Sequence, residues 1–253
     1  MSRKKLLIGV VALLVVSLAL VGVACCGGGE ATPTPAPTAT PTPVANETAT
    51  PAATETATPT AGEAPTLASG DTWTYSVAYE SDTNTMTQTV SAVGADSYTV
   101  DVTYDANIKR SAFGLDVEVS GIEGTISKDN LDMTKQVIQI AKPISTTATY
   151  TYVYTHPAAK WPLAVGNEWS FELTTKTALG TDTFDRTVKV VAEEDVTVGA
   201  ETFSCFKIET SEGGAVVKTE WFAEDVKNFV KVVDAATYAS EETWELTSYT
   251  VAP

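Results

Sequence analysis

Alternation of apolar and polar residues with a period of two restricts the fold of this chain more than any other feature. In the stretch DTWTYSVAYE, the side chains of Trp73, Tyr75, Val77 and Tyr79 alternate with Thr, Ser and Ala. Strict alternation is typical of a β-strand with one buried face. The segments SYTVDVTYD, TYTYVY and EWSFEL repeat the pattern, so the sequence predicts many half-buried strands.

Turn signals separate these segments at short intervals. Gly94-Ala95-Asp96 and Gly213-Gly214 are examples, and such residues favour tight connections between strands. The segment DNLDMTKQVIQIAK has some helical spacing, but its β-branched end favours a strand. We therefore predict an all-β fold, a mostly antiparallel meander of about eleven or twelve strands that forms a curved sheet or an open barrel.

A weak internal repeat points to two similar halves, residues 66–155 and 162–253. GDTWTY matches GNEWSF, and the same offset of 96 residues carries ISKDNLDMTKQV onto FAEDVKNFVKVV. The join falls in YTHPAAKWPLAVG, where two prolines interrupt strand pairing. One continuous sheet would make an open barrel, and two separate lobes would make small sandwiches. Chance similarity among β-rich segments is the third alternative.

Two segments of the second half carry a family resemblance. VTVGAETFSCFKIE (196–209) and EWFAEDVKNFVK (220–231) follow a G-x-x-W opening in this order. Together they resemble the TapB-like envelope proteins, whose β-sheet domain is similar to the half-barrels of LolA-like lipoprotein carriers. Lys227 stands where the pattern usually has Gly. The resemblance implies a fold and not a reaction.

The N-terminus has the organisation of an export signal. Arg3, Lys4 and Lys5 precede an uncharged apolar run, and small residues come directly before Cys25. The segment resembles a bacterial lipoprotein signal, which predicts a signal peptide over 1–24 and a lipid on Cys25. Ordinary signal cleavage and a retained membrane span are the alternatives. Whether Cys26 is modified stays open.

Residues 25–65 form a predicted stalk between this anchor and the β domain, 66–253. The stalk is rich in Thr and Pro, and after its two cysteines it has too little apolar surface to offset the entropy of folding. Frequent Pro favours extended conformations. The expected localisation is therefore extracytoplasmic, with the β domain held away from a membrane of the bacterial cell envelope or surface.

Charge narrows the classes of partner. The chain has 32 acidic and 16 Lys and Arg residues, a formal net charge of −16. Such a chain repels nucleic acids and anionic lipid headgroups.

Cys205 lies between two phenylalanines in TFSCFKI, which favours a small buried residue over a reactive thiol.

Residues with catalytic chemistry are few. His156 is the single histidine and precedes a proline in the expected join, so a solvated loop residue is the favoured interpretation. Acidic and amide residues form two clusters that would suit either calcium or ordinary turns. We expect no catalysis, no cofactor and no metal site. The two clusters are Asp129, Asn130 and Asp132, and Glu224, Asp225 and Asn228.

Aromatic residues offer the most concentrated recognition chemistry. They would form the core, line a concave sheet face that holds an apolar ligand, or stack on sugars. The sequence thus predicts a non-catalytic envelope lipoprotein that binds an apolar ligand or an envelope partner. A structural or adhesive surface domain is the alternative, and a carboxylate-based hydrolase is a distant one. The aromatic residues concerned are Trp73, Tyr75, Tyr79, Trp169, Phe171, Trp221 and Trp244.

Overall fold

The structure is a computed structural model that describes residues 64–112, 115–143, 145–178, 180–235 and 241–252. The expected signal peptide 1–24, the lipid-bearing Cys25 and nearly all of the stalk lie outside these residues. Within the described ranges, the chain contains no helix with the length and apolar character of a membrane span.

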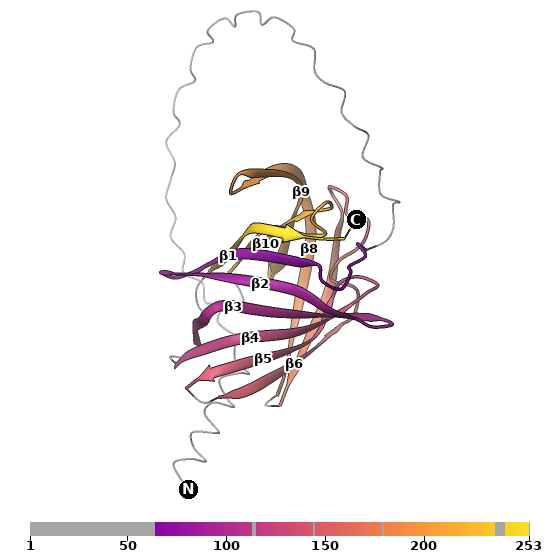
Figure 1. Cartoon of the computed structure of the whole chain (residues 1–253). Helices are drawn as coiled ribbons and strands as arrows, with labels where there is room; N and C mark the ends of the chain where they lie inside the picture. Colours follow the sequence, from indigo (N-terminus) through magenta and orange to yellow (C-terminus); the bar gives the residue numbers. More distant parts are fainter. Residues whose placement is uncertain (1–63, 113–114, 144, 179, 236–240, 253) are drawn as a thin grey trace, which may run out of the picture. The chain divides into compact units, whose positions relative to one another are not determined.

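The β domain is built from strands, and a longer loop connects β6 to β7 (Figure 1). Its described part contains twelve strands and no helix, which confirms the predicted all-β fold of about eleven or twelve strands. In chain order the strands are β1 (Thr72–Tyr79), β2 (Asp82–Val93), β3 (Ser97–Ala112), β4 (Leu115–Ser127), β5 (Met133–Lys142), β6 (Thr146–Tyr154), β7 (Glu168–Thr177), β8 (Gly180–Val198), β9 (Glu201–Glu212), β10 (Ala215–Ala223), β11 (Asn228–Asp234) and β12 (Glu242–Thr250).

The strands form a closed barrel. Each strand pairs with the next in antiparallel fashion, and β1 also pairs with β12, from Thr72 opposite Thr250 to Tyr79 opposite Glu242. The two sets of six strands therefore join at both seams, β6 to β7 and β12 to β1. The sequence left three arrangements open, namely a curved sheet, an open barrel and two sandwiches. The structure shows one closed barrel instead. Closure pairs the strand edges that an open sheet would expose.

Side chains alternate between the inside and the outside of the barrel, as the period of the sequence predicts. In β1, Trp73, Tyr75 and Val77 are buried, whereas the intervening Thr and Ser side chains keep accessible surface. The hydroxyls of Thr74 and Thr87 lie 3.4 Å apart across the outer face of β1 and β2. This part of the wall presents hydroxyl groups outside and apolar groups inside.

Buried side chains form two clusters, and both reach the end of the barrel where the odd-numbered strands begin. We call it the tryptophan end, because Trp73 and Trp169 lie there. The ring N–H of Trp73 donates to the carbonyl of Val226 at 2.8 Å, and that of Trp169 donates to Ala158 at 3.2 Å. These bonds tie the starts of β1 and β7 to the connecting loops. The clusters comprise Leu67, Trp73, Tyr75, Val77, Met86, Val90, Tyr98, Val100, Val198, Cys205, Ala223, Val226, Val230 and Leu246, and Leu163, Trp169, Phe171, Val188, Val190, Ile208 and Phe222.

The starts of β1 and β7 are built with the same hydrogen bonds. The N–H of Gly70 donates to Val90 at 2.8 Å, and the N–H of Gly166 donates to Val190 at 2.9 Å. Both glycines have positive φ, 94° and 92°, a conformation that glycine adopts without steric cost. The tryptophan three residues after each glycine is buried in both cases. The two starts are therefore equivalent, whereas duplication of whole halves stays a prediction.

The turns that precede β5 and β11 correspond in the same way. Leu131 and Lys227 stand 96 residues apart, and both are left-handed, with φ of 61° and 58°. Lys227 is the position at which the TapB-like pattern usually has Gly. The backbone there keeps a conformation that glycine favours, and the Lys227 ammonium donates to the carbonyl of Ala252 at 2.7 Å.

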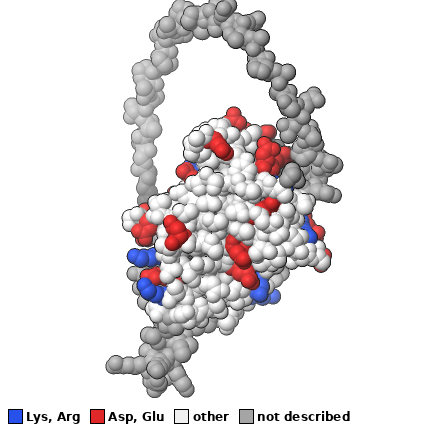
Figure 2. All heavy atoms as spheres, viewed as in Figure 1, with Lys and Arg blue, Asp and Glu red and all other residues white. Residues whose placement is uncertain are grey.

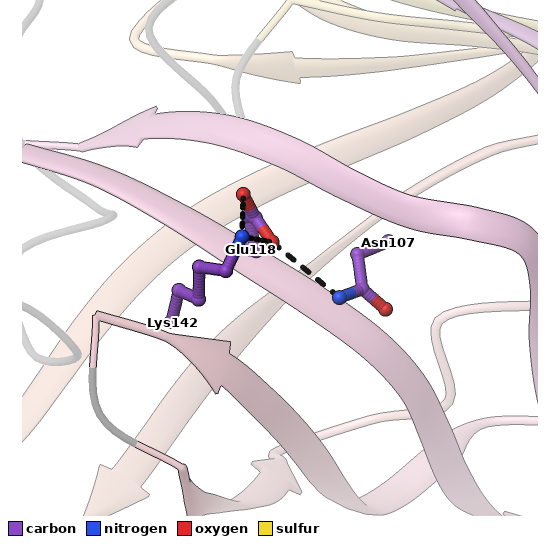
Figure 3. A network of polar contacts seen from close by, with 3 residues as sticks. All are labelled: Asn107, Glu118 and Lys142. Carbon is purple, nitrogen blue, oxygen red and sulfur yellow. Dashed lines mark hydrogen bonds and ion pairs between the residues drawn. The ribbon is translucent and has the colours of Figure 1, made fainter.

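Charged groups are distributed over the outer face. Figure 2 shows carboxylates spread across the visible side of the barrel rather than gathered in one patch. On β3–β5, Lys142 donates to the Glu118 carboxylate at 3.1 Å and the Asn107 amide donates to it at 3.4 Å (Figure 3). The hydrogen bond from Lys142 holds the pKa of Glu118 below its ordinary value. The three residues link three adjacent strands on an exposed surface, where solvent screens their charges.

Candidate ligand-binding site

A cavity of about 350 Å³ that is wide open to solvent lies where β6 separates from β5. The β5–β6 pairing extends only to Lys135 opposite Thr151, and from Thr151 onward β6 pairs with β7. The last residues of β6 thus leave the start of β5, and side chains line the space between them. We call this space the side pocket and define it by Asn130, Asp132, Tyr152, Tyr154 and His156.

Two tyrosines of β6 bridge the space between the strands. The hydroxyl of Tyr154 donates to the carbonyl of Met133 at 3.0 Å, and that of Tyr152 donates to the amide oxygen of Gln136 at 2.8 Å. Burial raises the pKa of both tyrosines, so both hydroxyls stay protonated. They replace the missing ladder bonds with side-chain bonds, which fixes the two rings in the pocket wall.

Asp132 connects the turn before β5 to the loop between β6 and β7. Both oxygens of its carboxylate accept the N–H of Ala158, each at 3.1 Å, and its own N–H donates to the side chain of Asn130 at 3.0 Å. The side chain is buried, with 6% of its surface exposed. Burial raises the pKa of Asp132 to about 6, although hydrogen bonds from Ala158 and Ala159 oppose this.

His156 lies at the mouth of the side pocket and is exposed. The sequence predicted a solvated loop residue before a proline. His156 is exposed in the structure, as predicted. Asp132 and two tyrosines line the same cavity. The strand register brings these groups together, because Asp132 and His156 flank β5 and β6 at the same end of the barrel.

A second group of polar side chains projects into the barrel from β8, β9 and β10. Arg186 precedes the buried Val188 by two residues, and its guanidinium lies 2.8 Å from the carboxylate of Glu212. Lys218 and Glu220 are in phase with the buried Phe222 and form an ion pair. We call Arg186, Glu212, Lys218 and Glu220 the inner ion network.

The environment of Lys218 is strongly acidic. Burial alone would lower the pKa of Lys218, but the charges of Glu220 and Asp234 and the hydrogen bond to Glu220 outweigh burial and raise it. The ammonium therefore stays charged. Its side chain keeps 31% of its surface accessible, and that of Glu212 keeps 36%. These side chains project inward and keep accessible surface, so the inner face of β9 and β10 is polar at this level.

Tyr154 lies between the side pocket and the inner ion network. Burial is the main cause of its raised pKa, and the charges of Asp132 and Glu220 raise the pKa further while Arg186 lowers it. Along β6, the rings of Tyr150 and Tyr152 stack with centroids 6.3 Å apart. The inner wall of β6 is thus aromatic, and it separates an acidic pocket from a set of paired ions.

The aromatic residues singled out from the sequence divide into two groups. Trp73, Tyr75, Tyr79, Trp169 and Phe171 are buried. The Trp244 ring packs against that of Tyr75, with centroids 6.1 Å apart.

Trp221 belongs to the second group, because it lies on the outer face. The ammonium groups of Lys207 and Lys231 stand 5.6 and 5.9 Å from its ring centre, and its ring N–H donates to Glu194 at 2.7 Å. These neighbours hold the ring against the wall, which is a structural role for an outward tryptophan.

The two clusters considered for calcium serve turns. Side-chain oxygens of Asn130 and Asp132 accept backbone N–H groups, and that of Asn228 accepts the N–H of Phe229 at 2.8 Å. In the part of the chain that is described, no three His, Cys, Asp or Glu side chains gather as a metal-binding group. Cys205 is buried, and burial followed by the charges of Asp195 and Glu194 raises its pKa to about 11.

Comparisons with known proteins leave the family open. The chain matches no protein-family model, no curated protein and no solved structure at a significant level. The resemblance to the TapB-like proteins therefore stays a prediction.

Proposed function

We propose that this chain is a non-catalytic binding module of the bacterial cell envelope, anchored by lipid on Cys25, that holds a small polar ligand in the side pocket. The observation that carries the proposal is the cavity of about 350 Å³ lined by Asn130, Asp132, His156 and two tyrosines. Small-molecule sites typically have volumes of about 300–1,000 Å³ and a few convergent polar groups.

The character of the interior favours a polar ligand over the apolar ligand expected from the sequence. Apolar side chains pack against one another at the tryptophan end, where Trp73 and Val226 are almost fully buried. The side pocket, in contrast, is lined by the carboxylate of Asp132 and by Asn130 and His156. An apolar ligand there would strip water from these polar groups without replacing it.

The arrangement of Asp132 and His156 favours binding over hydrolysis. Both oxygens of Asp132 accept backbone hydrogen bonds that hold the β6–β7 loop, and His156 is exposed at the mouth. A general acid or base needs a free oxygen or nitrogen aimed at the reacting atom. The carboxylate of Asp132 is engaged in holding the fold, which supports a binding role.

Charge and anchoring define the setting of this module. A net charge of −16 disfavours nucleic acids and anionic headgroups as partners. The Thr/Pro stalk would let the barrel meet small molecules or an envelope protein at a distance from the membrane. A structural or adhesive surface domain is the account that remains if the side pocket binds nothing.

A ligand screen by thermal unfolding tests the proposal on the full chain in detergent. The panel contains amines, amino acids, neutral sugars and short fatty acids. Val153 lines the pocket and is 46% exposed, so Val153→Trp places a bulky ring in the pocket lining without entering the core. A ligand present at 100 times its Kd stabilises the folded state by about 2.7 kcal/mol, which raises Tm measurably.

The matched control is Val216→Trp, at an exposed valine of β10 that is 50% accessible. We expect at least one compound to raise Tm in the wild type and in Val216→Trp but not in Val153→Trp. An equal rise in all three proteins, or no rise with any compound, would contradict the proposal.

A further inference from the structure

We propose that the side pocket recognises an organic cation, a small ligand with an amine or quaternary ammonium group. The inference rests on the proposed function and names its ligand class. Three observations carry it: the buried carboxylate of Asp132, the rings of Tyr152 and Tyr154, and a pocket lining that contains no Lys or Arg.

Asp132 has hydrogen bonds but no counter-charge. With only 6% of its surface exposed, it accepts the backbone N–H of Ala158 on both of its oxygens, each at 3.1 Å. Among the described residues, no Lys or Arg forms an ion pair with it, in contrast to Glu212 and Glu220 of the inner ion network. A buried carboxylate without a cation is costly, and a bound ammonium group would offset that cost.

The tyrosines supply the second part of the chemistry. A cation over an aromatic ring is attracted by the negative face of the ring, more strongly when water is excluded. Tyr152 and Tyr154 are both half-buried and both line the cavity. Their hydroxyl hydrogens are already donated to Gln136 and Met133, so the hydroxyls offer only oxygen lone pairs to a ligand.

The charge of the lining disfavours anions. A positively charged ligand is attracted by the carboxylate of Asp132 and by the oxygens of the two tyrosines, whereas an anion would meet a buried negative charge. Arg186, whose charge acts on Tyr154 of the pocket, is paired with Glu212 at 2.8 Å. The field that an incoming group meets at this pocket is therefore negative.

A bare metal ion fits less well than an organic cation. Calcium requires six to eight oxygen ligands, but both oxygens of Asp132 accept backbone N–H groups and the side-chain oxygen of Asn130 accepts the N–H of Asp132. A cavity of about 350 Å³ also exceeds the volume of an ion and suits a small organic molecule.

The test is calorimetric titration of the full chain in detergent at pH 7.5 with choline and with its neutral isostere 3,3-dimethylbutan-1-ol. Glucose is the third probe. We expect choline to bind at least about tenfold more tightly than the isostere, since a cation–π contact with a tyrosine ring and the attraction of a buried carboxylate together are worth that difference. Equal affinity for choline and its isostere would overturn the inference.

Variants locate the site. Asp132→Asn removes the charge, and we expect choline affinity to fall by about tenfold or more. Asp129→Asn is the matched control, because Asp129 lies exposed in the same turn and makes the same change in net charge. Unchanged choline affinity in Asp132→Asn would contradict the inference.

A second pair of variants keeps the test decisive if Asp132→Asn fails to fold. Tyr152→Phe keeps the ring and Tyr152→Leu removes it, so choline affinity should survive the first change and fall severalfold in the second. Equal loss in both would count against recognition by the ring.

The probes also distinguish the two proposals. If glucose binds in a Val153-dependent manner and choline does not, the proposed function stands and the cation inference fails. If no probe or panel compound binds, both fail.

Discussion

At the scale of single residues, burial decides both the chemistry and the stability of this barrel. Asp132 is a buried carboxylate that lines the side pocket together with two tyrosines. Its pKa is raised to about 6 because burial penalises its charge. Trp73 and Trp169 are buried through the same close packing, and each also donates a hydrogen bond to a loop carbonyl. Changes at these residues should therefore have large and specific effects.

The pH dependence of unfolding should report on Asp132. The folded-state pKa is above the unfolded value of about 3.9, so the folded state binds this proton more tightly. The resulting contribution to stability is fully present below about pH 3.9 and is lost as the pH rises through 6. Asp132→Asn lacks this pH-dependent contribution, whereas the wild type loses it as the pH rises. The free energy of unfolding of the variant, relative to that of the wild type, should therefore increase by about 1 kcal/mol from pH 5 to pH 7. Denaturant titrations at the two pH values measure it, and a constant difference would contradict the assignment.

The buried tryptophans should be equally important. Trp73→Ala and Trp169→Ala each remove a large buried ring at equivalent places, and each should lower the free energy of unfolding by about 3–5 kcal/mol. Urea unfolding followed by circular dichroism gives the values. A loss below about 1 kcal/mol at either position would mean that its ring does not pack as described.

At the scale of elements, strands β8–β10 combine an outer polar face with charges on the inner face. Arg186 and Glu212 face each other across the β8–β9 pairing, at 2.8 Å between guanidinium and carboxylate. A charge left alone in such a place is costly, whereas two matched apolar side chains are tolerated.

A double-mutant cycle tests the Arg186–Glu212 pair. Arg186→Met alone should destabilise the barrel by about 1–3 kcal/mol, because Glu212 is left without its partner. Arg186→Met combined with Glu212→Met should recover part of that loss. Additive effects of the two single changes, measured by denaturant unfolding, would mean that the two side chains do not interact.

Much of the strand pattern was predictable from the sequence, and the candidate site was not. The period of two in β1 identifies Trp73, Tyr75 and Val77 as buried, since their phase is unambiguous. The closure of β1 on β12 depends on long-range pairing that local patterns do not encode. The inner ion network did leave a signal that could have been used: Arg186 and Lys218 occupy the buried phase of their strands.

The side pocket left a weaker signal. It depends on where β6 stops pairing with β5, and on Asp132 meeting a loop 26 residues away in the chain. Asp132 stood out from the sequence only as part of an acidic cluster, and His156 only as a single histidine. Bringing them to one cavity requires the register of four strands, which propensity and spacing do not supply.

At the scale of the whole molecule, the account joins a barrel with a polar pocket to a lipid-anchored stalk. The anchor is a prediction that intact mass of the membrane-extracted protein can check. We expect loss of residues 1–24 and a lipid mass on Cys25, and Cys25→Ser should leave the protein without that mass. A retained Met1, or an unmodified Cys25 at the N-terminus, would contradict anchoring.

Native mass spectrometry of the gently extracted full chain reports directly whether the side pocket is occupied. The comparison is between the wild type, Val153→Trp and Val216→Trp, at valines that are 46% and 50% exposed. The account predicts a bound small molecule in the wild type and in Val216→Trp, and its loss in Val153→Trp. The same bound mass in all three proteins, or none in the wild type after incubation with the ligand panel, would contradict it.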